Sequence, residues 1–352
     1  MSELQQKLTE SGGNLGTLHG HDQILDFGDP AAEFAALQTS CGIVDFSPRT
    51  QIDLDGEDSA TFLHNLCTND IKALTPGTGC ETFLTNAQGK IIGHGYIYHM
   101  PSGCVLETIP GVGDELTAYF DRYIFREKVT PLDHSERWHE LVVAGPNAIN
   151  VLQQAGFSTL PQANYSHVPL EFNNAPLTIR KVDFVAASCF QINALREPLP
   201  ALWDALTAAG AVPCGATAWE QARIMHGTPL YGIDITEENL PQEVDRNDSA
   251  ISFTKGCYIG QETVARIDAL GHVNKTLCKL HISGETPAAG DEFFAKDDTQ
   301  RAKSLGTITS VCAAPDQANA DGTTSIALGY VRRGSNSPGT EFQGDGFTLS
   351  VV

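Results

Sequence analysis

The sequence lacks any long apolar run. Its uninterrupted apolar stretches are only a few residues long, whereas a helix needs roughly 20 apolar residues to cross a bilayer. Residues 1–13 are polar and include acids, whereas a secretory leader begins with basic residues followed by an apolar segment. We therefore expect a cytoplasmic protein with no membrane partner.

Cysteine pairs at metal-binding spacing are also absent. The chain has nine cysteines, an odd number, and no two of them stand in a CxxC pattern. A disulfide framework and a structural zinc site are therefore not predicted, and we assign no metal ligands. Eight of the nine cysteines are interpreted as small buried hydrophobic residues, and the exception is Cys257.

Positive charge is scarce. Lys and Arg total 22 against 43 Asp and Glu, which gives a formal net charge of −21. Such a surface repels phosphate backbones, so we expect no direct nucleic-acid partner. The glycine-rich loops GxGxxG and GxxxxGK[ST], which cradle nucleotide phosphates where a strand turns into a helix, do not occur either.

The spacing of apolar residues predicts an α+β protein. Strands and helices do not alternate strictly, and a hairpin signal surrounds residues 86–89, so a doubly wound parallel sheet is disfavoured. Residues 156–176 are predicted to form a loop. From residue 277 onward no helical period remains, which indicates a small all-β domain, either a barrel or a sandwich. Residues 22–46 are predicted to be helical and then extended, with Pro30 in the first turn of a helix. Further helices are predicted near residues 58–66, 114–124, 148–152, 198–206 and 218–226, and strands at 51–55, 82–85, 91–98, 105–109, 141–144, 177–182, 184–192, 277–282, 304–311, 325–331 and 347–352.

The segment KGCYIGQE, residues 255–262, concentrates residue types that carry chemistry. Gly260 is placed to open a helix at Gln261, because glycine tolerates the left-handed backbone of a tight turn. Cys257 would then lie between Lys255 and a helix N-terminus, and both favour the thiolate form of a cysteine. The same spacing is typical of a structural turn around a buried cysteine, and spacing alone does not separate the two. The residues assigned to this motif are Lys255, Gly256, Cys257, Tyr258, Gly260, Gln261, Glu262 and, just beyond it, Arg266.

Together with the VAR that follows, KGCYIGQE resembles the signature of the YgfZ family of folate-binding proteins, relatives of the glycine-cleavage T-protein (aminomethyltransferase). Weaker resemblances follow in the same order along nearly the whole chain, at residues 54–56, 68–71, 223–235, 241–243, 304–310 and 326–332. The resemblance implies three modules around a central tetrahydrofolate pocket. Residues 1–270 would form the folate-binding region from two interleaved α+β modules, and residues 275–352 a small C-terminal β-barrel.

The cofactor implied by the resemblance is tetrahydrofolate or a one-carbon derivative, a flat pterin with an anionic glutamate tail. Arg223 is the candidate cation for the tail carboxylates, with an ion pair at the core rim as the alternative. Glu243 is the candidate for the pterin edge, with a solvated carboxylate as the alternative. Tyr98 and Tyr231 are candidate aromatic walls, although each also fits a core position. Gln261 completes the predicted cofactor-binding set.

Two departures from the T-protein bear on chemistry. Gly93 and His94 stand where the T-protein carries acids, in a pattern like Gly-Gly-Val-Ile-Asp-Asp, and Ala187 stands where it carries the Glu of a segment like Gly-Tyr-Thr-Gly-Glu. Acid–base help contributes about 10²–10⁴ in rate. The losses argue against ordinary glycine-cleavage chemistry and are compatible with folate binding. His94 is the one nearby substitute base, and otherwise a polar strand residue.

The function implied by the resemblance is support of the assembly or repair of iron–sulfur enzymes, and indirectly of tRNA modification. Cys257 and Lys255 are the candidate catalytic residues. The thiolate would hold a one-carbon unit, or bind iron or sulfide transiently, since a stable cluster usually needs four thiolates. The alternatives are a folate-dependent aminomethyl or one-carbon transferase or demethylase, and a non-catalytic module that keeps only the fold. Expected partners are folate and iron–sulfur enzymes or assembly proteins.

Overall fold

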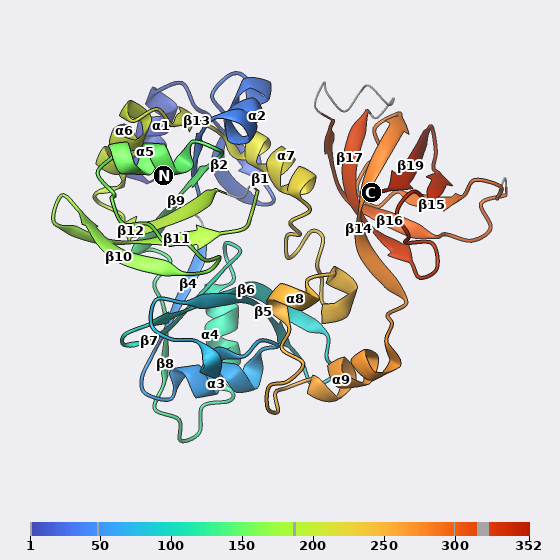
Figure 1. Ribbon diagram of the computed structural model, residues 1–352, viewed down its shortest axis with the longest axis horizontal. Coiled ribbons are helices and arrows are strands. Elements are labelled where there is room, and N and C mark those ends of the chain that lie inside the picture. Colours follow the sequence, from blue (N-terminus) through green and yellow to red (C-terminus); the bar gives the residue numbers. More distant parts are fainter. Residues whose placement is uncertain (1, 48, 186–187, 299, 315–323) are drawn as a thin grey trace. The chain divides into compact units, whose positions relative to one another are not determined.

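The computed structural model of the protein describes residues 2–47, 49–185, 188–298, 300–314 and 324–352 (Figure 1). The chain forms two compact units. Unit 1 comprises Met1–Thr82 and His94–Ala222, and unit 2 comprises Phe83–Gly93 and Arg223–Val352. Both units therefore contain segments that are distant in the sequence.

A six-stranded sheet with the order β10-β11-β12-β9-β3-β13 forms the larger layer of unit 1. Its pairs are antiparallel except for β13, which runs parallel to β3. Helices α1, α5 and α6 pack their apolar side chains into the same core as this sheet, and Leu8, Leu152 and Trp203 are examples. The strands are β3 (Gly42–Asp45), β9 (Trp138–Ala144), β10 (His167–Phe172), β11 (Ala175–Val182), β12 (Cys189–Leu195) and β13 (Val212–Pro213), and the helices are α1 (Glu3–Glu10), α5 (Ala148–Gln154) and α6 (Leu199–Ala208).

A second sheet has five strands in the order β5-β6-β7-β4-β8. Strands β5 and β6 form a hairpin whose tip, Phe83–Gly93, belongs to unit 2. The elements are β4 (Thr50–Asp55), β5 (Gly79–Thr85), β6 (Ile91–Met100), β7 (Gly103–Thr108) and β8 (Thr130–Asp133), with α3 (Ser59–Leu66), the short 3₁₀ helix η1 (Ile71–Ala73) and α4 (Gly113–Asp121).

Two further elements of unit 1 lie near its N-terminus. Strands β1 (Asn14–Leu18) and β2 (His21–Asp26) form a separate hairpin. Helix α2 (Pro30–Thr39) follows, and its start is fixed locally. The Asp29 side chain accepts a hydrogen bond of 3.0 Å from the Ala32 amide, and Pro30 occupies the first turn, where a missing amide hydrogen costs nothing.

The C-terminal strands of unit 2 close into a barrel with the order β14-β17-β16-β15-β18-β19. Its interior is filled by apolar side chains that include Phe293, Ile308 and Phe342. The strands are β14 (Lys275–Gly284), β15 (Glu292–Ala295), β16 (Gly306–Ala313), β17 (Ser325–Arg332), β18 (Glu341–Gln343) and β19 (Phe347–Val351). Before the barrel, unit 2 contains the end of α7 (Ala216–His226), then η2 (Pro241–Val244), α8 (Asn247–Ala250) and α9 (Gln261–Leu270).

The predicted fold class, mixed α/β modules followed by a closed C-terminal β-barrel, is confirmed. The prediction of a loop over 156–176 was wrong, because β10 lies within it. Pro169 in this strand pairs with Thr178 of β11, and β10 is the outermost strand of its sheet, where a proline removes no ladder bond on the free side. The helical prediction from residue 22 was wrong for residues 22–26, which lie in strand β2. Sequence periodicity also missed α1, β1, β8, β15 and β18. No helix in the described part of the chain combines the length and the apolar character needed to span a bilayer.

Candidate functional site

The KGCYIGQE segment forms a tight turn into α9, as its glycines predicted. Gly260 is the residue before the helix and has φ 84°, in the region that favours glycine. A Cβ atom at this position would lie 2.5 Å from the backbone oxygen of Asn86. Gly260 is therefore needed twice, for its backbone angle and for the close approach of the hairpin tip within unit 2.

The tip of the β5–β6 hairpin holds this turn in place. Thr85 donates its hydroxyl hydrogen to the carbonyl oxygen of Ile259 at 2.5 Å. The Asn86 side chain accepts from the amides of Gln88 and Lys90, each at 3.0 Å, which is the local side-chain bonding typical of asparagine in turns. The turn that carries Cys257 is thus fixed by two parts of unit 2 that are far apart in the sequence.

Cys257 is the one exposed cysteine of the nine in the chain. Burial raises the pKa of Cys41 and of Cys214 to about 12 and that of Cys104 to about 11, so these thiols stay protonated at neutral pH. Lys255 is buried, and its ammonium lies 4.7 Å from the centre of the Tyr258 ring. The structure thus exposes the thiol and packs the neighbouring cation against an aromatic ring.

The remaining motif residues divide between surface and core. Gly256, Glu262 and Arg266 are exposed, and Gln261 is half-buried at the start of α9. Tyr258 is buried in a core cluster with Val264 of α9. Glu262 lies in the first turn of the helix, where a carboxylate is favourable to the helix dipole.

Arg223, the predicted cation for folate, is buried and occupied inside unit 2. Its Nη1 atom lies 2.6 Å from Oδ2 of Asp234 and donates to the carbonyl oxygen of Thr228 at 3.2 Å. Its Nη2 atom donates to the hydroxyl oxygen of Ser310 at 2.9 Å. Binding a folate carboxylate would require this guanidinium to leave a buried carboxylate unpaired, so its surroundings favour an internal role.

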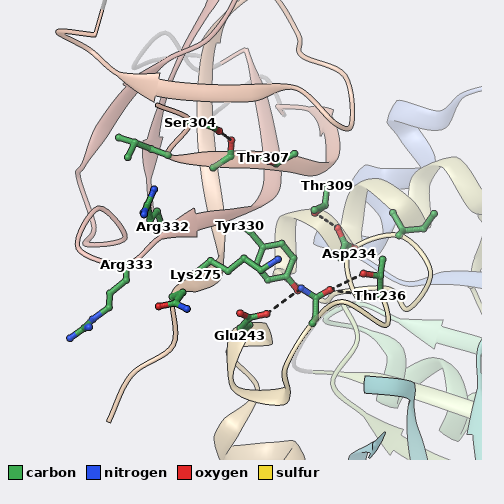
Figure 2. Close-up of a pocket in the computed structure, with 15 residues that line it drawn as sticks. Asp234, Thr236, Glu243, Lys275, Ser304, Thr307, Thr309, Tyr330, Arg332 and Arg333 are labelled. Carbon is green, nitrogen blue, oxygen red and sulfur yellow. Dashed lines mark hydrogen bonds between the residues drawn. The ribbon is translucent and has the colours of Figure 1, made fainter. Parts of the chain in front are cut away.

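Glu243 and Tyr231 also lie in unit 2. Glu243 is buried, and its Oε2 atom accepts a hydrogen bond of 3.1 Å from the Leu240 amide at the start of η2. It lines a pocket with Asp234, Lys275 and Tyr330 (Figure 2). Tyr231 is partly buried against the core cluster that contains Ile224 and Val244. Neither side chain is a freely solvated group.

Tyr98 belongs to a buried polar cluster of unit 1. The Arg180 guanidinium lies 4.2 Å from the centre of the Tyr98 ring, and the ring is fully buried. The Arg180 Nη1 atom lies 3.2 Å from Oε1 of Glu140 and 3.9 Å from Oε2 of Glu107. Gln191 bridges the two carboxylates, with Nε2 at 2.8 Å from Glu107 and 2.6 Å from Glu140. Tyr98 therefore packs against charged groups of the core, and its contact with a cofactor remains a prediction.

Burial changes the pKa of a carboxyl group in this cluster. Desolvation, followed by repulsion from Glu107, raises the pKa of Glu140 to about 8, against the opposing attraction of Arg180. Arg49 bonds Glu107 through its Nε atom. Two carboxylates and two guanidinium groups thus share one buried network, in which burial shifts Glu140 toward its protonated form.

His94 also lies in unit 1, and it faces a buried carboxylate. Its Nε2 atom lies 2.8 Å from Oε1 of Glu81. The hydroxyl of Tyr165 donates to the other oxygen of Glu81 at 3.2 Å. A carboxylate on one ring nitrogen fixes the tautomer and the orientation of an imidazole. Gly93, in β6, has no side chain to exchange a proton, and Ala187 lies outside the described residues.

Aromatic rings gather near this pair in unit 1. The Tyr96 ring lies 4.9 Å from Phe184 and 5.5 Å from Tyr165. The Phe46 ring lies 4.9 Å from Trp219, and the Arg49 guanidinium lies 4.9 Å from the Phe46 ring. Phe46, Trp219 and Arg49 are only half-buried, so flat rings and a guanidinium remain partly accessible here.

Comparison with known proteins assigns the chain to a family. A family model described as the GCVT N-terminal domain matches residues 4–255, well over half of the chain. The chain belongs to the GCVT family. A chloroplastic protein of Arabidopsis thaliana named "putative transferase" is 27% identical over 334 residues, which cover 94% of this chain and 74% of the relative.

The aminomethyltransferase of a Synechocystis strain is 27% identical to this GCVT-family chain over 338 residues, covering 93% of the chain and 87% of the relative. The crystal structure of glycine cleavage system aminomethyltransferase T from Bartonella henselae superposes with a TM-score of 0.87 at 19% identity, covering 98% of this chain and 94% of that one. The structural likeness shows that the two share a fold.

Several functional groups of the site escaped the sequence reasoning. Glu81, Glu107 and Glu140 each stand within a strand that is almost entirely buried, and all three are buried themselves. A charged residue within a buried-strand pattern is itself a signal, because burying it requires a partner. Among the described residues, no group of three His, Cys, Asp or Glu side chains gathers as a metal site.

Proposed function

We propose that this GCVT-family chain binds tetrahydrofolate or a one-carbon derivative and acts as a YgfZ-type factor that supports the assembly or repair of iron–sulfur enzymes, and through them tRNA modification. The observation that carries the proposal is the exposure of Cys257 on a turn fixed by Gly260 and the hairpin tip. A thiol held in this way is available to a ligand or a partner, whereas the fully buried cysteines are not.

Folate binding is supported by the chemistry of the side chains in unit 1. The half-buried rings of Phe46 and Trp219 suit the flat face of a pterin. Arg49 bonds Glu107 through Nε. The terminal nitrogens of its guanidinium make no hydrogen bond within the described residues, and a guanidinium fork suits a carboxylate. Arg49 is thus a better candidate than Arg223 for an anionic group of folate, because both terminal nitrogens of Arg223 already bond within unit 2.

A role other than glycine cleavage is supported by the residues at the positions where the T-protein carries acids. Gly93 offers no proton-transfer group, and the second position carries a histidine, His94, in place of an acid. One thiolate cannot hold a stable cluster, which usually needs four. Cys257 would therefore hold iron, sulfide or a one-carbon unit transiently, with Lys255 as a nearby cation packed on Tyr258.

Calorimetric titration with tetrahydrofolate tests the cofactor, and complementation tests the thiol. We expect the wild type and Cys257→Ala to bind folate equally, because the change removes one exposed side chain. In cells that lack this protein, Cys257→Ala should fail to restore the activity of a cluster-dependent enzyme, whereas the matched variant Cys312→Ala should restore it. Folded protein that binds no tetrahydrofolate would refute the cofactor, and full rescue by Cys257→Ala would refute the thiol role.

A second candidate function, a folate-dependent transferase or demethylase, is favoured by the His94–Glu81 pair. A histidine oriented by a buried carboxylate can accept a proton from a substrate amine. The test is turnover of an aminomethyl or N-methyl donor in the presence of tetrahydrofolate. Loss of turnover in His94→Ala, with folate affinity retained, would support this function. No turnover by the wild type would eliminate it.

A further inference from the structure

Unit 2 contains a pocket of about 850 Å³. Lys275 of β14, Thr307 of β16 and Tyr330 of β17 line it from the barrel (Figure 2). Thr236 lines it from the segment before η2, and Glu243 lines it from η2 itself. Its volume falls in the range of about 300–1,000 Å³ that small-molecule sites occupy. The pocket lies wholly within unit 2 and does not include the KGCYIGQE turn.

Three cations surround this pocket. Arg332 and Arg333 are exposed and Lys275 is half-buried. None of the three forms an ion pair with an acid among the described residues. Other basic residues of unit 2 are paired, such as Lys296 with Glu341 and Arg301 with Asp345. The chain as a whole is acidic, with 22 basic and 43 acidic residues. Three cations without an acidic partner around one pocket therefore stand out from the rest of the chain.

The wall of the pocket carries a buried hydroxyl group without a partner. Tyr330 is 7% exposed, and its hydroxyl group makes no hydrogen bond within the described part of the chain. The Lys275 ammonium lies 4.5 Å from the centre of its ring, and Figure 2 shows the two side chains together. Burial, and then Glu243 and Asp234, raise the pKa of Tyr330. The hydroxyl therefore stays protonated and can donate to an acceptor on a ligand.

Two carboxylates also line the pocket, and each accepts at least one hydrogen bond within unit 2. Asp234 pairs with Arg223, and its oxygens accept further bonds from Thr309 at 2.5 Å and Ser310 at 2.7 Å. Glu243 accepts a bond from the Leu240 amide. Asp234 is therefore paired with a cation, whereas Oε1 of Glu243 accepts no hydrogen bond among the described residues. Among the residues that the structure describes around this pocket, three cations without an acidic partner thus stand against one carboxylate without a cationic partner.

We propose that this pocket binds the oxyanion groups, carboxylate or phosphate, of a small molecule. Arg332 and Arg333 would hold the charged groups at the rim, because guanidinium forks match both oxyanions. Lys275 and the Tyr330 hydroxyl would hold a further acceptor deeper inside. The ligand would be either the γ-linked glutamate chain of a folate or a free phosphorylated metabolite. The folate source rests on the proposed function, whereas the phosphate source does not.

Two probes distinguish the sources: tri-γ-glutamate and tripolyphosphate, each titrated calorimetrically at low salt into the full-length chain. We expect the wild type to bind at least one of them. Tighter binding of tri-γ-glutamate would identify the folate chain, and tighter binding of tripolyphosphate a phosphorylated metabolite. Raising the salt concentration should weaken either interaction.

Three variants locate the binding. The double variant Arg332→Gln/Arg333→Gln should weaken the preferred probe by about tenfold or more, and Tyr330→Phe by about threefold to tenfold. The control Arg301→Gln removes one barrel cation outside the pocket and should change affinity less than twofold. Thermal unfolding of each variant verifies that the fold is retained.

The outcomes separate this proposal from the cofactor proposal. Titration with monoglutamyl tetrahydrofolate should give the same affinity in the wild type and in the double variant, because the pterin would be held elsewhere. If neither probe binds the wild type, or if Arg301→Gln weakens binding as much as the double variant, the pocket is not an oxyanion site. Either result leaves folate binding untouched.

Discussion

Replacing Glu140 by Gln should change how the stability of unit 1 depends on pH. Burial and the neighbouring Glu107 raise the pKa of Glu140 in the folded protein to about 8, from an ordinary value of 4.5. Between these two values the folded state binds more protons than the unfolded state. The stabilising contribution is therefore complete below about pH 4.5 and is lost as the pH rises through about 8.

The size of the effect follows from the linkage relation. For one titrating group, the unfolding free energy changes by at most about 1.4 kcal/mol for each pH unit. Between pH 6 and pH 8 the unfolding free energy of the wild type should fall, relative to Glu140→Gln, by up to about 2 kcal/mol. The variant lacks the titrating group, so its own unfolding free energy should vary less over this interval.

Tryptophan fluorescence is a suitable readout for this experiment. The three tryptophans, Trp138, Trp203 and Trp219, all lie in unit 1, as does Glu140. Urea unfolding followed by fluorescence at pH 6, 7 and 8 therefore reports the unit that contains the substitution. Glu171→Gln serves as the control, because Glu171 is an exposed residue of β10 in the same sheet.

A difference between the wild type and Glu140→Gln that stays constant from pH 6 to pH 8 would refute the reasoning. It would mean that Glu140 is ionised in the folded protein throughout this range, with Arg180 outweighing burial. The same pH dependence in Glu171→Gln relative to the wild type would show that the effect is not specific to the buried cluster.

Three further predictions concern unit 2. Gly260→Ala should destabilise the turn by about 1–3 kcal/mol, because alanine disfavours φ 84° and its Cβ would meet the Asn86 carbonyl. Faster proteolytic cleavage near residue 257 would show this destabilisation, and an unchanged cleavage rate would contradict it. Arg223→Ala and Asp234→Ala should each lower the unfolding free energy by about 3–5 kcal/mol, because each leaves a buried charge unpaired. In a double-mutant cycle followed by thermal unfolding, the double variant should lose less stability than the sum of the two single variants. Strict additivity would argue against the ion pair. Iodoacetamide should label native protein first at Cys257, the one exposed cysteine; mass spectrometry should find this fast label absent from Cys257→Ser, and its persistence would place the reactive thiol elsewhere.

Local features were predictable from the sequence, and long-range pairings were not. Gly260 marks the start of α9 because a left-handed turn is a property of the residue itself. Arg223 stood out as a cation, but only the fold shows that Asp234 and Ser310, 87 residues away, take up its guanidinium. The sequence alone does not show whether an arginine is free to bind a ligand or already forms an ion pair inside the protein.

The buried cluster of unit 1 shows the same limit. Glu107 lies on β7, Glu140 on β9 and Arg180 on β11, and these strands belong to two different sheets. Strand patterns predict that each residue lies in a sheet, but the meeting of the two sheets places the charges together. Strand β10 was missed for a different reason, since Pro169 and the polar residues before it read as a loop until its edge position is known.

The hairpin tip has a consequence for the order in which the chain is made. Phe83 and Ile91 are buried in a cluster with Ile224 and Val244, and the tip also meets Gly260. During synthesis, the tip leaves the ribosome about 170 residues before Gly260, which at about 5–20 residues per second is a delay of roughly 10 to 30 s. For that interval Phe83 and Ile91 lack the side chains that bury them in the folded unit, because those residues have not yet been translated.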